Sequence, residues 1–168
     1  MKLFCMFTAV LLAAIAQCAV AADKSNGITY QDVKLQIARI QVQDSVSFDD
    51  AVESLKLRAN QHNLKFVGVN AIYKEIESLT GKPAKRMEIF NFCDGLTANK
   101  MLQADITMIA YMPCRIAILE DAQGKRWVIS MMMDLAKVKK LPADARASAE
   151  RVMAAMKDMM VAASSGDL

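Results

Sequence analysis

Two cysteines, Cys93 and Cys114, constrain the fold more than any other feature of this sequence. The chain has four cysteines, but Cys5 and Cys18 fall in a segment typical of a cleaved export signal. Each of the other two lies at the end of an expected strand. The cysteines meet if these strands are antiparallel neighbours, whereas parallel strands would hold them roughly 20 Å apart, beyond the reach of a disulfide.

The first 21 residues have the three parts of a secretory signal. Lys2 precedes an apolar stretch over residues 3–16, and Ala19 and Ala21 are the small residues that a signal peptidase reads. We expect cleavage after Ala21, a periplasmic location, and a single domain over residues 22–168. The apolar stretch is too short to span a membrane, and no later run matches it, so we expect no membrane span in the mature chain.

Charge and motif content argue against nucleic-acid binding and give little support to enzyme chemistry. The chain has 21 Lys and Arg against 18 Asp and Glu, and no basic stretch is interleaved with aromatic residues. His62 is the sole histidine, no paired carboxylates have acid–base spacing, and there is no glycine-rich phosphate loop. We therefore expect a binding or accessory protein rather than an enzyme.

Hydrophobic spacing predicts strands and helices in the order β-α-β-β-α-β-β-α. In the first strand the apolar phase slips between Ile37 and Ile40, which suggests a bulge. Ser47 and Asp94 are suitable N-caps, Leu96 is expected to point inward, and residues 121–124 form a hairpin turn. The expected strands cover about 33–42, 64–73, 86–93, 114–121 and 126–132. The expected helices cover about 47–63, 95–104 and 143–163, and residues 74–79 are expected to form a short turn or helical piece.

Strands joined by hairpins, with helices on one face, predict an α+β fold. It is a two-layer sandwich with a mostly antiparallel sheet of about five strands. The long C-terminal helix, with an apolar stripe that includes Val152, Met153 and Met156, is expected to pack on one face of this sheet.

Two short motifs around the cysteines resemble the domain-of-unknown-function 302 (DUF302) family. They are Phe92-Cys93-Asp94, followed by a short helix, and the run Tyr111-Met112-Pro113-Cys114-Arg115-Ile116-Ala117. Many members have Cys-Asn-Pro at the first position, where this chain has Asp94-Gly95. The resemblance implies a small TATA-binding-protein-like α+β fold that is often dimeric, and it implies no established activity.

The cysteine pair and its neighbours Asp94, Met112, Pro113 and Arg115 form the candidate site. Three interpretations stay open: a structural disulfide, a redox-active or ligand-binding dithiol, and two unconnected buried thiols. The sequence therefore predicts a site for an unknown small ligand or protein partner, with a thiol-active protein of sulfur-compound metabolism as the alternative.

Metal binding is a third possibility, although no cofactor is predicted. The chain has 13 methionines, and soft thioethers of an exported protein can hold Cu(I), with Met112 as the most plausible additional ligand. Methionine more often fills gaps in a core, so core packing is the favoured explanation and copper or haem is secondary.

The segment over residues 105–113 is too apolar for a solvated loop. Ile106, Ile109 and Tyr111 are among its large side chains. We expect this segment to be buried in part and to contact a second copy of the chain in a homodimer.

Overall fold

The computed structural model describes residues 28–30, 35–138 and 141–167. The expected signal over residues 1–21 and its cleavage site lie outside the described residues, as do Lys139 and Lys140. Lys34–Leu168 form one compact unit.

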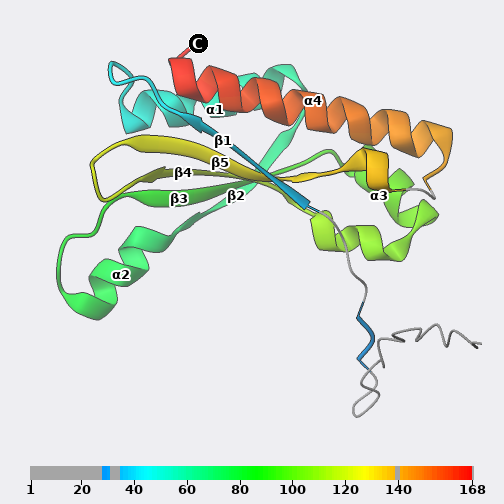
Figure 1. The fold of residues 1–168 in the computed structure, drawn as a ribbon, viewed down its shortest axis with the longest axis horizontal. Coiled ribbons are helices and arrows are strands. Elements are labelled where there is room, and N and C mark those ends of the chain that lie inside the picture. The colour runs from blue at the N-terminus through cyan, green and yellow to red at the C-terminus, as the bar shows by residue number, and fades with distance from the viewer. Residues whose placement is uncertain (1–27, 31–34, 139–140, 168) are drawn as a thin grey trace, which may run out of the picture. The chain divides into compact units, whose positions relative to one another are not determined.

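A five-stranded antiparallel sheet is the centre of this unit, with the strand order β1-β5-β4-β3-β2 (Figure 1). The expected α+β fold is therefore confirmed. The strands are β1 (Leu35–Gln41), β2 (Lys65–Ala71), β3 (Met87–Cys93), β4 (Cys114–Glu120) and β5 (Arg126–Met133).

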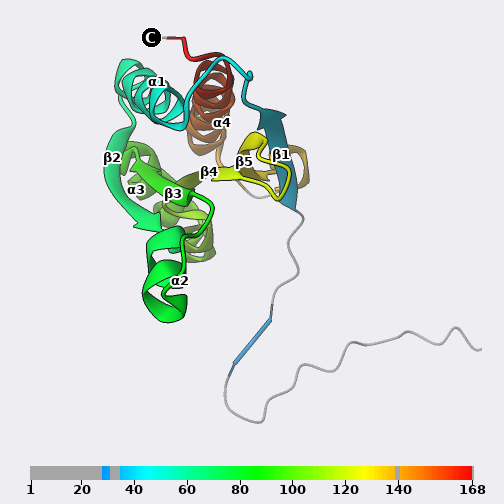
Figure 2. The same cartoon turned by 90° about the vertical axis from the view of Figure 1, so that its left-hand side faces the viewer.

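Two helices, α1 (Phe48–Gln61) and α4 (Ala143–Ser165), pack against each other and cover one face of the sheet (Figure 2). At one end of the sheet lies α2 (Ile72–Thr80), and at the other lie α3 (Gly95–Ala104) and the 3-10 helix η1 (Ile106–Tyr111) (Figure 1). A short 3-10 turn, η2 (Leu135–Lys137), joins β5 to α4.

The main core lies between the sheet and this helix pair. Strict alternation along β3 buries Phe90 and Phe92, while Met156 and Met159 of α4 are buried from the helix side. A second, smaller buried cluster contains Met101 of α3, Met108 of η1 and Ala149 of α4. The site described below lies where these two clusters meet.

The bulge that the sequence predicts in β1 is absent from the described strand. The pairing of β1 with β5 runs without interruption from Leu35↔Met133 to Gln41↔Trp127. Ile37 is 77% exposed while Ile40 packs against the core, so the apolar residues change from one face of the sheet to the other without a change of register. The irregularity occurs instead in β2, between Phe66 and Gly68.

The helix caps and the hairpin follow the sequence expectations. The Ser47 hydroxyl accepts from the Asp50 backbone N–H at 3.0 Å in a capping box, and Asp94 caps α3. Gly124 has φ 77° in the hairpin turn, a conformation that favours glycine. Leu96 differs from its expectation, because it is 80% exposed rather than turned inward.

Among the described residues, no helix is both long enough and apolar enough to span a bilayer.

Candidate functional site

The pairing of β4 with β5 stops short of the end of the sheet where both cysteines lie. The pairing of these strands runs from Glu120↔Arg126 to Ile116↔Ser130 and goes no further, although β5 continues to Met133. At the last pair the Ser130 hydroxyl donates to the Arg115 carbonyl oxygen at 2.7 Å. Beyond this point Cys114 is paired with β3 and Met132 with β1.

A cavity of about 60 Å³ lies at this end of the sheet. Its walls come from the ends of β3, β4 and β5, from α3 and η1, and from the first half of α4. The lining residues are Phe92, Cys93, Asp94, Thr97, Ala98, Met101, Tyr111, Met112, Cys114, Met133, Ala149, Val152 and Met153. The wall is mainly apolar and sulfur-bearing, and six of these residues carry a sulfur atom.

Both cysteines line this cavity on adjoining antiparallel strands, as the sequence predicts, but they do not form a disulfide. Each is a free thiol and each is partly buried. The register of the two strands explains this outcome. Cys114 of β4 is paired with Phe92 of β3, so Cys93 lies one residue beyond the position opposite Cys114. Successive side chains of a strand point to opposite faces, so Cys93 leaves β3 on the face opposite that of Phe92. The expected structural disulfide is therefore wrong for this structure.

The environment of Cys114 opposes ionisation of its thiol. Burial, together with the negative charges that Cys93 and Asp94 can carry, raises the pKa of Cys114 to about 11. At neutral pH this side chain is a protonated thiol, and the thiol is a much weaker nucleophile than the thiolate. The arrangement gives no support to a thiol–disulfide exchange reaction that begins at Cys114.

Asp94 is held as a carboxylate by α3 and α4. It accepts from the Thr97 hydroxyl at 2.8 Å, from the Leu96 and Thr97 backbone N–H groups at 3.1 Å, and from Arg151 Nη2 at 3.2 Å. Burial by itself would raise the pKa of Asp94, but the Thr97 hydrogen bonds and the Arg151 charge outweigh it and lower that pKa below its ordinary value. Arg151 Nη2 also donates to the Thr97 hydroxyl at 3.0 Å. The polar side chains at this edge of the cavity, Asp94, Thr97 and Arg151, are therefore hydrogen-bonded to one another.

The remaining predicted neighbours of the cysteines separate into two groups. Met112 lines the cavity, but Pro113 and Arg115 line a smaller adjoining cavity of about 30 Å³. The peptide bond between Met112 and Pro113 is cis, and Arg115 is exposed. The structure thus brings Asp94 and Met112 to the cysteine pair and leaves Pro113 and Arg115 beside it.

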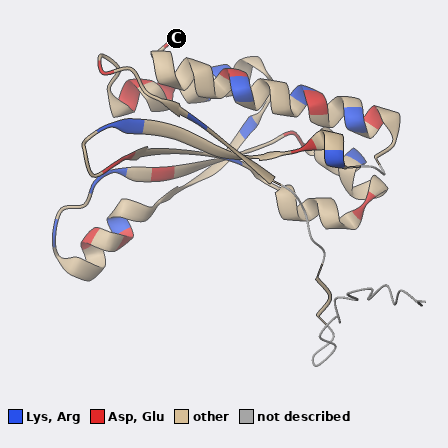
Figure 3. Cartoon of the chain, in the orientation of Figure 1, with Lys and Arg blue, Asp and Glu red and all other residues tan. Residues whose placement is uncertain are grey.

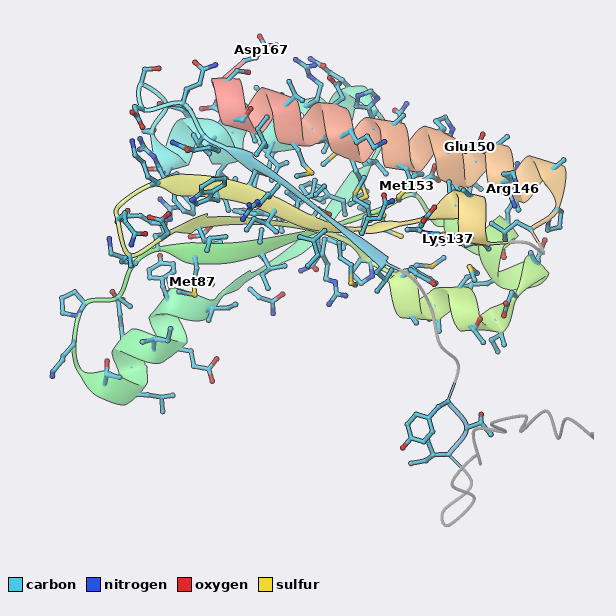
Figure 4. All side chains as sticks on the ribbon, in the orientation of Figure 1. Met87, Lys137, Arg146, Glu150, Met153 and Asp167 are labelled. Atoms are coloured by element: carbon cyan, nitrogen blue, oxygen red, sulfur yellow. The ribbon has the colours of Figure 1, made fainter. Side chains whose placement is uncertain are left out.

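Three further sulfur-bearing residues of the site, Met101, Met133 and Met153, were not predicted as such, whereas Tyr111 belongs to the 105–113 segment that the sequence places beside the cysteines. Cys114, Tyr111, Met133 and Met153 line both the main and the adjoining cavity, so they form the wall between the two. In Figure 4 the Met153 side chain extends from α4 toward the strands. Met133 and Met153 fall in runs of methionine that the sequence shows, but their spacing does not reveal that they share a cavity with the cysteines.

His62 does not take part in the cysteine cavity. It lies at the end of α1, where its Nε2 is 2.7 Å from Asp158 Oδ2 on α4. Arg58 Nη1 donates to both oxygens of the same carboxylate at 3.0 Å. The sole histidine is therefore a residue of the α1–α4 interface, as expected for a helix-end histidine.

Comparison with known proteins supports the resemblance that the two cysteine motifs indicate. Residues 39–163 match the family described as domain of unknown function DUF302. The crystal structure of an uncharacterized conserved DUF302 protein from Bacillus stearothermophilus aligns with a TM-score of 0.63 and 11% sequence identity, over 76% of this chain and 97% of that chain. At this identity the likeness concerns the fold alone. A comparison with curated proteins finds no match.

Proposed function

The chain belongs to the DUF302 family, a family defined by a domain of unknown function, and on this premise we propose a function from the site itself. The protein is a non-enzymatic binding or accessory module. It holds a small ligand in the cavity beside Cys93 and Cys114, and it binds this ligand without turnover.

One observation carries this proposal: a half-open pocket of about 60 Å³ lined mainly by apolar side chains. Protein interiors are close-packed, and voids larger than a water molecule are few in a domain. An apolar wall of this kind favours contact with small apolar species over contact with water. The thiols of Cys93 and Cys114 are the polarizable groups that a ligand would meet there.

The state of the polar groups supports binding rather than catalysis. Cys114 is protonated at neutral pH, and the Asp94 carboxylate is bound to Thr97 and Arg151. A general base needs a free proton-accepting atom that faces the substrate. The polar partners around this cavity are directed at one another instead.

We also propose that the protein acts in the periplasm and as a homodimer. Residues 1–21 support export because they have the pattern of a secretory signal. Exposed apolar side chains on η1 support self-association: Ile106 is 78% exposed and Ile109 is 56% exposed, while Met108 between them is buried. Exposed apolar clusters of this kind are typical of protein contacts.

Xenon binding followed by methyl NMR tests the cavity directly. Xenon is a small apolar probe that enters dry apolar cavities. In reduced protein with labelled methionine methyl groups, we expect saturable shifts for Met101, Met112, Met133 and Met153. Met87 at the far end of β3 should show none (Figure 4).

A cavity-filling variant and a matched surface variant make this experiment decisive. Ala98→Phe places a ring at the cavity wall on α3, whereas Ala147→Phe makes the same change at an exposed position of α4. We expect Ala98→Phe to abolish the xenon shifts and Ala147→Phe to preserve them. Shifts that survive Ala98→Phe, or that appear equally at Met87, would overturn the proposed binding site.

A further inference from the structure

The ligand class follows from the atoms that line the cavity, and this inference rests on the proposed binding function. We propose that the cavity is a binding site for a soft monovalent metal ion, Cu(I). The thiol of Cys114 and the thioethers of Met133 and Met153 supply the donors, while Cys93 lines the same pocket from the other face of β3.

Sulfur is the dominant donor element at this site. The cavity is lined by the thiols of Cys93 and Cys114 and by the thioethers of Met101, Met112, Met133 and Met153. Thiolate and thioether ligands select Cu(I) over hard cations, which prefer carboxylate, carbonyl and water oxygens. Six sulfur-bearing residues line one small space, and this composition suits a soft ion.

The position of the methionines argues against packing as their whole role. Methionine usually fills irregular gaps in a core because it is long and flexible. Here four methionines from four elements, α3, the η1–β4 connection, β5 and α4, pack in or against the buried clusters and also line a common pocket. Met133 and Met153 also line the adjoining cavity together with Cys114. These three sulfur-bearing side chains therefore share the same wall from β4, β5 and α4.

The hard donors near the cavity have other partners. Asp94 and Thr97 hydrogen-bond to each other and to Arg151, and His62 contacts Asp158 outside the cavity. Within the described part of the chain, no three His, Cys, Asp or Glu side chains are grouped as metal ligands. A structural zinc ion takes four such ligands, so this site does not suit Zn²⁺.

Charge balance favours a monovalent ion. When Cu(I) binds at Cys114, the S–H bond breaks, a Cu–S bond forms and the proton leaves to solvent. Copper remains Cu(I), so no electron is transferred. One positive charge enters and one leaves, and the apolar cavity keeps its net charge, which avoids the cost of burying an uncompensated ion. A divalent ion would need both thiols to ionise beside the Asp94 carboxylate.

The volume of the cavity shows whether its ligand can be a large cofactor or only a single ion. Pockets for drug-sized ligands occupy about 300–1,000 Å³, whereas this cavity has about 60 Å³. A metal ion bound to sulfur at about 2.3 Å needs little more space than its own ligands leave. The cavity therefore fits an ion and does not fit haem.

Anaerobic titration of the reduced protein with Cu(I), in competition with a chromophoric Cu(I) chelator, tests the inference. We expect one Cu(I) per chain, held against the chelator, with Cu–S contacts alone in X-ray absorption spectra. Zn²⁺ should not compete at equal concentration. Sub-stoichiometric copper, Cu–N or Cu–O ligation, or equal binding of Zn²⁺ would overturn the site.

Two conservative variants identify the donors. Met153→Leu keeps a side chain of similar size but removes the sulfur atom, and Met87→Leu makes the same change at the opposite end of the molecule (Figure 4). We expect Met153→Leu to weaken Cu(I) binding about tenfold or more and Met87→Leu to leave it unchanged. Cys114→Ser should remove binding, and equal affinities of the two methionine variants would contradict the proposed ligands.

The xenon experiment distinguishes failure of this inference from failure of the proposed function. If xenon shifts the cavity methionines but Cu(I) does not bind, the cavity is a binding site for a different ligand and the copper assignment is wrong. If neither binds, both the site and its metal are wrong.

Discussion

Cys114 shows how a buried environment changes the chemistry of a single residue. Burial, together with the nearby Cys93 and Asp94 side chains, raises the pKa of this thiol to about 11. This value is well above that of an exposed thiol, so the folded chain disfavours the reactive thiolate by about two orders of magnitude at a given pH.

The pH dependence of thiol alkylation checks this property. In a Cys93→Ser variant that lacks residues 1–21, Cys114 is the one remaining cysteine. We expect its alkylation rate to rise about tenfold per pH unit from pH 7 to pH 10, because the thiolate fraction rises in that proportion below the pKa. A plateau by pH 9 would show an ordinary thiol. Asp94→Asn should move the profile to lower pH, because it removes a negative charge beside the thiol.

Asp94 also has a structural role as the N-cap of α3. Its carboxylate accepts from the Leu96 and Thr97 backbone N–H groups at 3.1 Å. Asp94→Ala should lower the free energy of unfolding by about 1–2 kcal/mol, while Asp94→Asn, which retains a capping oxygen, should lose much less. Urea denaturation measures both variants. Equal losses in the two variants would show that Asp94 contributes to stability through its negative charge and not through its capping hydrogen bonds.

At the level of secondary-structure elements, ion pairs connect α1 to α4 near the end of the sheet where the cavity lies. Asp158 of α4 contacts both Arg58 and His62 of α1. Residues of both charge signs are distributed along α4 (Figure 3). Hydrogen bonds from His62 and Arg58 lower the pKa of Asp158.

Removal of this carboxylate should weaken the helix pair in a pH-dependent manner. Because the pKa of Asp158 is lower in the folded state, its contribution is fully present above the unfolded pKa of about 4 and is lost as the pH falls through the folded pKa. Asp158→Asn should reduce the free energy of unfolding at pH 7 by about 0.5–1 kcal/mol, a small value because the side chain is partly exposed. The deficit should shrink below pH 4. Glu150→Gln, an exposed change on the same helix, is the control and should have no such effect.

The β4–β5 hairpin depends on a glycine, whereas α3 does not. Gly124 has φ 77°, while Gly95 at the start of α3 has no positive φ and has open space where the Cβ of a larger residue would lie. Gly124→Ala should cost about 1 kcal/mol, while Gly95→Ala should be neutral or slightly stabilising because alanine favours a helix. Thermal unfolding distinguishes these outcomes. Equal effects of the two substitutions would contradict the role assigned to the turn.

For the whole molecule, the arrangement of the layers leaves apolar side chains exposed in several places, of which two bear on self-association. One is η1, with Ile106 and Ile109, and the other is the sheet face opposite α1 and α4, with Ile37 and its cross-strand partner Met131. Analytical ultracentrifugation tests the proposed dimer and its contact surface.

We expect a dimer that Ile106→Lys combined with Ile109→Lys converts to a monomer and that Ile37→Lys leaves intact. Lysine in an apolar contact must lose its hydration without a partner, which makes association unfavourable. If Ile37→Lys alone dissociates the dimer, the contact surface is the exposed face of the sheet and not η1. A monomeric unmodified chain would reject the dimer.

The sequence by itself determined the order of elements, the caps at Ser47 and Asp94, the hairpin turn and the antiparallel placement of the cysteine strands. These features depend on local spacing and on residues with strong local preferences. Local patterns also mislead where a strand exposes apolar residues, as for Ile37, or where a helix does, as for Leu96.

Only the tertiary structure decided that the cysteines stay unpaired and that Met133 and Met153 join them around a cavity. Both outcomes depend on non-local geometry: the register of β3 against β4, and the point where β4 and β5 cease to pair. A shift of one residue in a register moves a side chain to the other face of the sheet, and spacing along one strand does not fix the register of its neighbour.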